Sequence, residues 1–184
     1  MKKSAFAKTM QCIAIATGLA AAAALGIWHF VRLPMVFTLF ISIFTVFYHF
    51  SVRLLIGYLV PNQWNPNGWW FRPRRFEAAL FRAIRIQKWK LHMPTYDPSK
   101  FSLKHNSYET LLKNMCQAEL VHTVIIPFSF VPLLFSIPWG EFWVFFATSF
   151  LAACFDLLFV MMQRYNRPRI MKIFARRAGG KVNG

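Results

Sequence analysis

Long apolar runs alternate with short polar intervals along this chain of 184 residues. A helix needs about 20 residues to cross a hydrocarbon core of roughly 30 Å. Four runs have that length, at about 10–31, 34–60, 118–138 and 140–163. Only short turns join the first run to the second and the third to the fourth, so each pair is expected to form a helical hairpin. The pattern therefore predicts an all-α polytopic membrane protein, with four transmembrane helices in two hairpins and a single membrane domain over residues 1–184.

The first apolar run has a second interpretation. It follows Lys2, Lys3 and Lys8 and contains an Ala-rich tract, which is also the anatomy of a cleaved signal peptide. The apolar sequence nevertheless continues past this tract through Trp28 to Val31 without a polar cleavage region. A retained transmembrane helix is therefore favoured.

Between the two hairpins lies a polar insert, residues 61–117. It starts as a Pro/Asn/Trp-rich loop, after which apolar residues recur at helical spacing from Phe76 onward, with basic residues between them. This predicts an amphipathic helix on an anionic membrane surface, anchored by Trp69, Trp70 and Trp89. A surface role of this kind accounts for the basic residues of the insert without a catalytic function.

Composition and charge support the membrane assignment and predict the orientation. The chain is 57% apolar and only 15% charged, where a soluble domain has about 25% charged residues. The net charge of +16 is confined to intervals between apolar runs, so no nucleic-acid partner is expected. Three basic residues precede the first run, ten lie in the insert and seven follow from Arg164. The positive-inside rule thus predicts a bacterial-type cytoplasmic membrane protein with a basic tail, 164–184, and with the insert and both termini in the cytoplasm.

Few ionisable residues interrupt the apolar runs, and nearly all lie toward the predicted cytoplasmic side. Such residues are costly in a bilayer and are functional candidates by default. Helical spacing places them in pairs on shared faces: His49 with Arg53, Glu119 with His122, and Asp156 with Gln163. A polar pocket open to the cytosol is therefore predicted, with access for a water-soluble donor and a lipid-dissolved acceptor.

His122 and Glu119 have the chemistry of a general base and its orienting carboxylate. Such a pair deprotonates a hydroxyl for attack on an acyl carbonyl. The segment lacks the second His of a zinc-binding HExxH helix, and the three cysteines show no metal-site spacing, so no metal is predicted. The chain contains no G-x-S-x-G elbow, Walker loop or dinucleotide fingerprint.

Two segments carry a family resemblance. They are Gln117-Ala-Glu-Leu-Val-His122, followed by Pro127, and the heptapeptide Gln163-Arg-Tyr-Asn-Arg-Pro-Arg169. Together with Glu77, Trp89-Lys90 and Pro94 in the insert, they resemble the glycosyl-4,4'-diaponeurosporenoate acyltransferase family, membrane enzymes of staphyloxanthin-type carotenoid synthesis. The resemblance spans about residues 70–175. It implies transfer of a fatty acyl chain to a sugar hydroxyl of a glycosylated terpenoid.

One position departs from the pattern of this family. Asp156 stands where a member of the family has Asn, seven residues before the Gln of the heptapeptide. A buried acid in place of an amide needs a cationic partner, such as Arg53 or His49, or must be protonated.

The leading hypothesis is an O-acyltransferase without a bound cofactor. It moves a fatty acyl group from a thioester donor, such as acyl-CoA, to a hydroxyl of a lipid, glycolipid or glycosylated terpenoid. The base is His122, oriented by Glu119. Arg164, Arg167 or Arg169 is predicted to bind the donor phosphates or the oxyanion. Gln163 and Asn166 are predicted to supply neutral hydrogen bonds. Asp156, His49 and Arg53 are predicted to complete the pocket for donor and acceptor.

Two alternatives come from other classes of protein. One is a membrane reductase or methyltransferase whose Arg-rich cytosolic exit binds a nucleotide cofactor. The other is a non-catalytic scaffold whose basic faces bind anionic membrane lipid.

Overall fold

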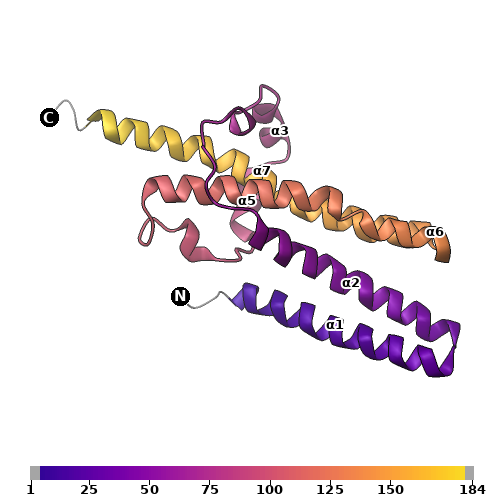
Figure 1. The fold of residues 1–184 in the computed structure, drawn as a ribbon. Coiled ribbons are helices and arrows are strands. Elements are labelled where there is room, and N and C mark those ends of the chain that lie inside the picture. The colour runs from indigo at the N-terminus through magenta and orange to yellow at the C-terminus, as the bar shows by residue number, and fades with distance from the viewer. Residues whose placement is uncertain (1–4, 181–184) are drawn as a thin grey trace.

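The computed structural model of this chain describes residues 5–180. The predicted cytoplasmic charges Lys2, Lys3 and Lys181 lie outside the described residues. The described part is all-helical and contains no strand. Its four long helices form two antiparallel pairs that run side by side (Figure 1). The first pair is α1 (Ala5–Val31) with α2 (Pro34–Leu59), and the second is α5 (Tyr108–Phe128) with α7 (Phe142–Gly180).

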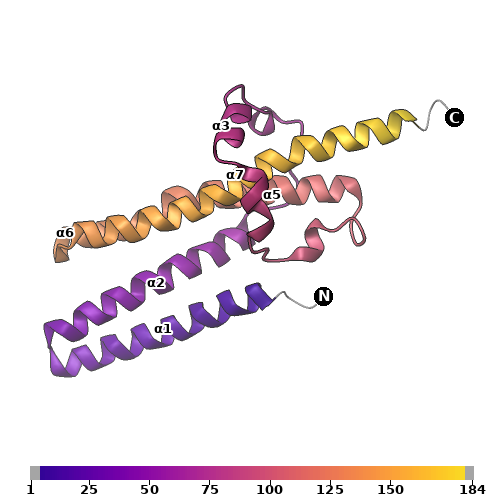
Figure 2. The ribbon, with the colours of Figure 1, turned by 180° about the vertical axis from the view of Figure 1, so that it is seen from behind.

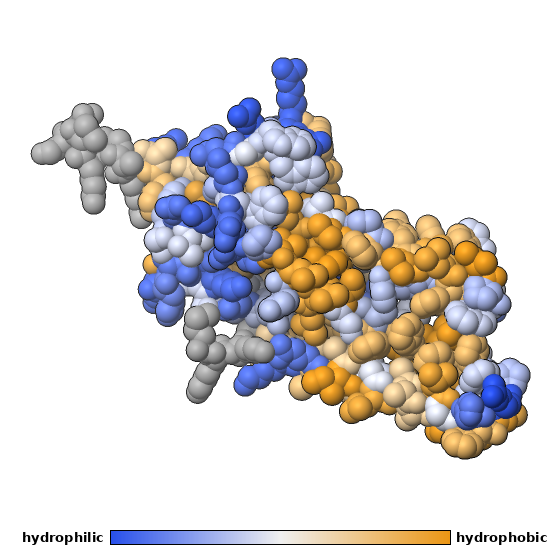
Figure 3. All heavy atoms as spheres, in the orientation of Figure 1, coloured by the Kyte–Doolittle hydropathy of each residue, from blue (hydrophilic) through white to orange (hydrophobic). Residues whose placement is uncertain are grey.

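Four helical segments are long and apolar enough to cross a membrane, as the sequence predicts: Ala5–Val31, Pro34–Leu59, Tyr108–Trp139 and Phe142–Arg176. Large apolar side chains are exposed on their outer faces, among them Phe30, Met35 and Trp143. These side chains gather toward the end with the two tight turns, while hydrophilic residues gather at the opposite end (Figure 3). An apolar surface of this extent indicates contact with lipid. We call the opposite end, which holds the segment between α2 and α5, the polar end.

The second hairpin departs from its predicted bounds at both ends. Helix α5 begins at Tyr108 rather than near 118, because the Ser107 hydroxyl caps it by accepting the Thr110 N–H at 3.2 Å. After Phe128 the chain continues as a 3₁₀ turn, Val131–Phe135, and then as α6, Ser136–Trp139. Helix α7 runs on through the predicted basic tail to Gly180 as one 39-residue helix, with Pro168 inside it.

Close packing of small residues joins α1 to α2. The buried residues of α1 are Met10 and four alanines. A Cβ atom at Gly18 would lie 2.9 Å from the ring of Phe47, so any larger residue requires that ring to shift. Small residues at such an interface bring the backbones close together where lipid supplies no hydrophobic driving force.

Hydrogen bonds and a small core connect the hairpins. The Tyr48 hydroxyl on α2 donates to the Phe128 carbonyl at 2.9 Å, and the Gln117 amide on α5 donates to the Val60 carbonyl at 2.6 Å. Between these two bonds, Ile125 packs against residues of α2. The contacts place α5 between α2 and α7.

The insert is helical in short pieces rather than as one amphipathic helix. Helix α3 (Glu77–Ala83) ends before Arg85, which has the left-handed φ of 50°, and α4 (Ile86–Trp89) follows. Short 3₁₀ turns at Trp69–Phe71, Lys90–His92 and Pro98–Phe101 complete the segment. Helix α3 lies beside α7, on the side away from α1 (Figure 2). Glu77 and Ile86 are buried, so the insert packs onto the protein as well as onto any membrane surface.

Candidate functional site

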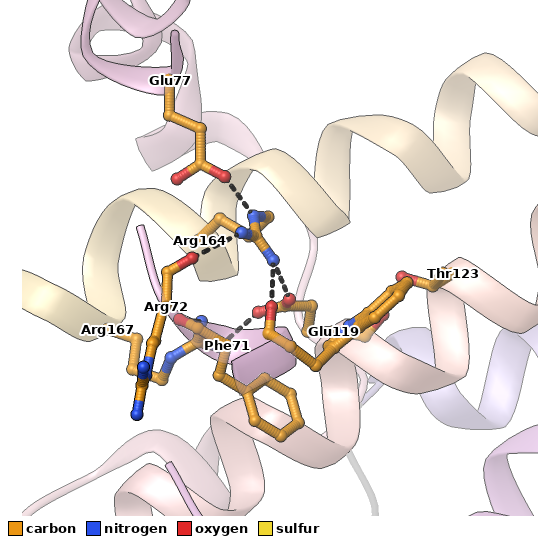
Figure 4. Close-up of polar contacts among 8 residues, drawn as sticks. Phe71, Arg72, Glu77, Glu119, Thr123, Arg164 and Arg167 are labelled. Carbon is orange, nitrogen blue, oxygen red and sulfur yellow. Dashed lines mark hydrogen bonds and ion pairs between the residues drawn. The ribbon is translucent and has the colours of Figure 1, made fainter. Parts of the chain in front are cut away.

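A buried ion cluster at the polar end contains two acids and two arginines. Glu119 of α5 is fully buried, and its carboxylate binds both Arg164, at 2.6 Å, and Arg167 of α7. Arg164 also binds Glu77 of α3 at 2.6 Å. Figure 4 shows the Arg164 side chain between the two carboxylates. The cluster is charge-balanced, which is the condition for burying such groups.

Three further hydrogen bonds from these arginines hold the insert against α7. Arg164 donates to the carbonyls of Trp70 and Arg72 at 3.2 and 3.1 Å. Arg167 donates to the Phe71 carbonyl at 2.6 Å, and its guanidinium carbon lies 4.8 Å from the centre of the Phe71 ring. Three successive carbonyls of the insert are thus satisfied by two side chains from α7.

This arrangement bears on the roles expected for both arginines. Arg164 and Arg167 are predicted to hold donor phosphates or an oxyanion, whereas in the structure their charges are balanced by Glu119 and Glu77, and Arg167 is only 1% exposed. Their observed contacts join α5 and the insert to α7. From the sequence, Glu77 was named only as part of the family resemblance and was assigned no role in a site. Its signal was its position as the one acid among the basic residues of 72–90.

A second polar cluster lies deeper along the helices and contains His122. The Nδ1 atom of His122 lies 2.8 Å from Oδ1 of Asp156, and the other carboxylate oxygen of Asp156 binds Arg53. Asp156 is fully buried. Arg53 also donates to the carbonyls of His49 and Ala152, at 2.6 and 3.2 Å. Helices α5, α7 and α2 each supply one member of this His122–Asp156–Arg53 cluster.

The carboxylate that orients His122 is therefore Asp156 and not Glu119. The i, i+3 spacing puts Glu119 and His122 on one face of α5, but Glu119 lies against the two arginines of α7 and is fully engaged by them. His122, one helical turn after Glu119 on α5, contacts Asp156 of α7 instead. Of the two cationic partners suggested for a buried Asp156, Arg53 and His49, the structure pairs it with Arg53.

The His122 ring is held in orientation by Phe159 and Asp156. The ring stacks on Phe159 with a centroid distance of 4.4 Å and an interplanar angle of 8°. Its side chain is 23% exposed. A carboxylate at Nδ1 favours the imidazole tautomer that carries its proton on Nδ1 and its lone pair on Nε2.

The other predicted site residues occupy different positions. Both ring nitrogens of His49 are buried and have no hydrogen-bond partner among residues 5–180. Gln163 is buried on α7, and Asn166 accepts a hydrogen bond from Lys90 at 3.1 Å. Arg169 is exposed at the polar end, outside both clusters. In the described part of the chain, no group of three His, Cys, Asp or Glu residues is close enough to hold a metal ion.

These features define a class of protein: a polytopic helical membrane protein with a histidine–carboxylate pair within its helices, close to the polar end. The family model for glycosyl-4,4'-diaponeurosporenoate acyltransferase matches residues 67–176, which is more than half of the chain. The chain belongs to this family, and the resemblance of its motifs is confirmed. The matched range contains His122, Asp156, Glu119 and the 163–169 heptapeptide. No curated protein and no solved structure matches the chain.

Proposed function

We propose that this protein transfers a fatty acyl group from a thioester donor to a hydroxyl of a glycosylated terpenoid or related lipid, with His122 as the general base. Membership of an acyltransferase family of carotenoid synthesis supports the reaction class. The single observation behind the residue assignment is the His122 Nδ1–Asp156 contact of 2.8 Å, made where Arg53 of a third helix binds the same carboxylate. The acceptor suggested by the family name is a sugar hydroxyl on a glycosyl carotenoid.

In this mechanism, Asp156 keeps the proton of the neutral imidazole on Nδ1, so Nε2 carries the lone pair. As the acceptor oxygen attacks the thioester carbonyl carbon, Nε2 takes the hydroxyl proton. The carbon–sulfur bond then breaks, and the leaving thiolate receives that proton from the imidazolium. The products are an ester and a free thiol. The Asp156 carboxylate stabilises the transient imidazolium, and Arg53 holds that carboxylate in place.

The position of His122 suits an acceptor that is dissolved in the membrane. Its ring is partly exposed and lies on a helix that is long and apolar enough to span the bilayer. A terpenoid chain remains among the lipids while its sugar reaches the polar end of the bundle. The proposal includes the predicted orientation, with the polar end and both termini in the cytoplasm, where a thioester donor is available.

The test is acyl transfer by full-length protein in proteoliposomes, supplied with a long-chain acyl-CoA and a glycosylated carotenoid. Ester formation is followed by mass spectrometry. His122→Gln is expected to lower the rate by about 10²–10⁴-fold, the usual contribution of a general base. The matched control is His105→Gln, the same substitution at an exposed loop position, and it should leave the rate unchanged.

Two outcomes would contradict the proposal. An H122Q protein with wild-type turnover and wild-type thermal unfolding would exclude His122 as the base. A C-terminal reporter that is active only outside the cytoplasm would exclude the proposed orientation.

A further inference from the structure

A pocket lies at the polar end, on the insert side of α7. It is a pocket of about 610 Å³ between α3–α4 and the last part of α7. Pockets for small molecules and cofactors typically have volumes of about 300–1,000 Å³. We call it the basic pocket, because six exposed cationic residues line it: Arg74, Arg82, Arg85, Lys88, Arg169 and Lys172.

The cations of the basic pocket have no counter-ion. None of the six is in an ion pair within residues 5–180. Glu77 is the sole acid that lines the pocket, and it is already bound to Arg164. Like charges that are gathered around one concavity repel one another, and a bound anion relieves that repulsion.

Tyr165 adds an independent sign of a ligand. It lines the pocket, is 6% exposed, and its hydroxyl has no hydrogen-bond partner in the described chain. The guanidinium carbon of Arg169 lies 3.7 Å from the centre of its ring, and Lys90 Nζ lies 4.8 Å from it. Burial, followed by the positive charge of Arg169, lowers the pKa of Lys90 below its usual value.

A left-handed backbone residue in the insert helps to form the basic pocket. Arg85 adopts a φ of 50°, a left-handed conformation that is unfavourable for a residue with a side chain. The break it makes separates α3 from α4, and residues from both helices line the pocket. Strain of this kind recurs at binding sites, where the surrounding structure maintains it.

We propose that the basic pocket binds the phosphate groups of the acyl donor, in the form of the phosphorylated nucleotide of a coenzyme A thioester. Guanidinium and ammonium groups are the usual ligands of phosphate oxygens. The inference rests on the proposed acyl transfer, because it gives the donor of that reaction its anchoring site.

The pocket is placed to deliver a donor to His122. Arg164 lines the pocket and also contacts Glu119, which is one helical turn from His122 on α5. Along α7, Arg164 follows Asp156 by eight residues, or about 12 Å. An extended thioester arm is the part of the donor that spans such a distance while its nucleotide stays at the polar end.

Binding is tested with full-length protein in nanodiscs of zwitterionic lipid. The probes are coenzyme A, dephospho-coenzyme A, which lacks the 3'-phosphate, and vesicles that contain phosphatidylglycerol. The paired variant Arg82→Gln/Lys88→Gln should weaken coenzyme A binding by about tenfold or more, since it removes two charge-assisted contacts. Loss of the 3'-phosphate should weaken binding to the wild type in the same direction. Lys104→Gln, an exposed lysine outside the pocket, is the matched control and should not change binding.

The H122Q protein separates this proposal from the catalytic one. It should bind coenzyme A like the wild type while its acyl transfer is lost, and R82Q/K88Q should raise the KM for acyl-CoA with little change in kcat. Equal coenzyme A affinity of R82Q/K88Q and K104Q would overturn the donor-site proposal, whatever the fate of His122. Three other results would also overturn it. Coenzyme A and dephospho-coenzyme A could bind the wild type equally well, or R82Q/K88Q could weaken binding to phosphatidylglycerol vesicles but not to coenzyme A. The enzyme could also turn over with an acyl-carrier protein as donor but not with acyl-CoA.

Discussion

Glu119→Gln separates the structural role of Glu119 from the catalytic role that its spacing with His122 suggests. The substitution keeps the shape of the side chain and removes its charge. In the structure this carboxylate is the counter-ion of Arg167, whereas Arg164 retains a second carboxylate, Glu77. The loss therefore falls mainly on Arg167, which is 1% exposed and would be left as a buried cation without a partner.

The expected cost is large because neither partner is screened by water. Glu119 is fully buried, and removing one partner of a buried ion pair costs about 3–5 kcal/mol. The weakened arginines also hold three carbonyls of the insert, so residues 70–72 should detach from α7 before the helices unfold. A double variant with Arg167→Met should be less destabilised than the sum of the two single variants, since the second change removes the unpaired charge.

The assay is unfolding of the purified protein by SDS in mixed micelles, combined with hydrogen exchange of residues 70–77. Glu109→Gln is the matched control, since it is the same change on the same helix in an exposed i, i+4 pair with Lys113, and it should leave the transition unchanged. If E119Q and E109Q unfold alike, the ion cluster does not stabilise the fold. If E119Q folds like the wild type and loses acyl transfer as fully as H122Q, then Glu119 is a catalytic group and the role assigned to Asp156 is wrong.

Three further predictions follow from single contacts. Asp156→Ala should lower kcat by about 10²-fold or more. Asp156→Asn should lower kcat less, because the amide oxygen still accepts a hydrogen bond from His122 Nδ1. Equal losses in the two variants would show that the charge of Asp156 matters and not its orienting contact. Gly18→Val should separate α1 from α2, because its Cβ would lie 2.9 Å from the Phe47 ring. Cysteine crosslinking between the two helices should detect this separation. Gly57→Val is the control, because Gly57 has open space around it. Arg85→Gly should stabilise the insert or leave it unchanged, because it relieves the left-handed strain of about 1–2 kcal/mol, and should still weaken coenzyme A binding; a marked loss of thermal stability would refute the strain argument.

The helical architecture was predictable because it follows from local properties of the chain. Four apolar runs of sufficient length predict four spans, and two short turns predict hairpins, as the structure confirms. The start of α5 at Tyr108 and the continuation of α7 beyond its apolar run were not predictable from hydropathy, since both helices extend into polar sequence. There, contacts between the helices replace lipid as the stabilising environment, such as the Tyr108 hydroxyl donating to the Ile170 carbonyl at 2.8 Å.

The residues of the candidate site were also predictable as a group, but not their pairing. The free-energy cost of an ionisable residue inside a membrane span identified His49, Arg53, His122 and Asp156 as candidates from the sequence alone. Helical periodicity then compares residues within one helix, and so it paired His122 with Glu119. The observed partners come from different helices, with α7 supplying Asp156 to His122.

By itself, the sequence determined that this chain is a helical membrane protein with its charge at one end and with acids and histidines inside its spans, because length, hydropathy and charge act locally. Only the tertiary structure decided which acid meets which cation. Glu119 forms ion pairs with Arg164 and Arg167, the two arginines that bind the insert. Asp156 pairs with His122 and Arg53 and is therefore part of the candidate site. The physical reason is that a buried charge is tolerated only beside its opposite, and the packing of α2, α5 and α7 sets which opposites lie within reach.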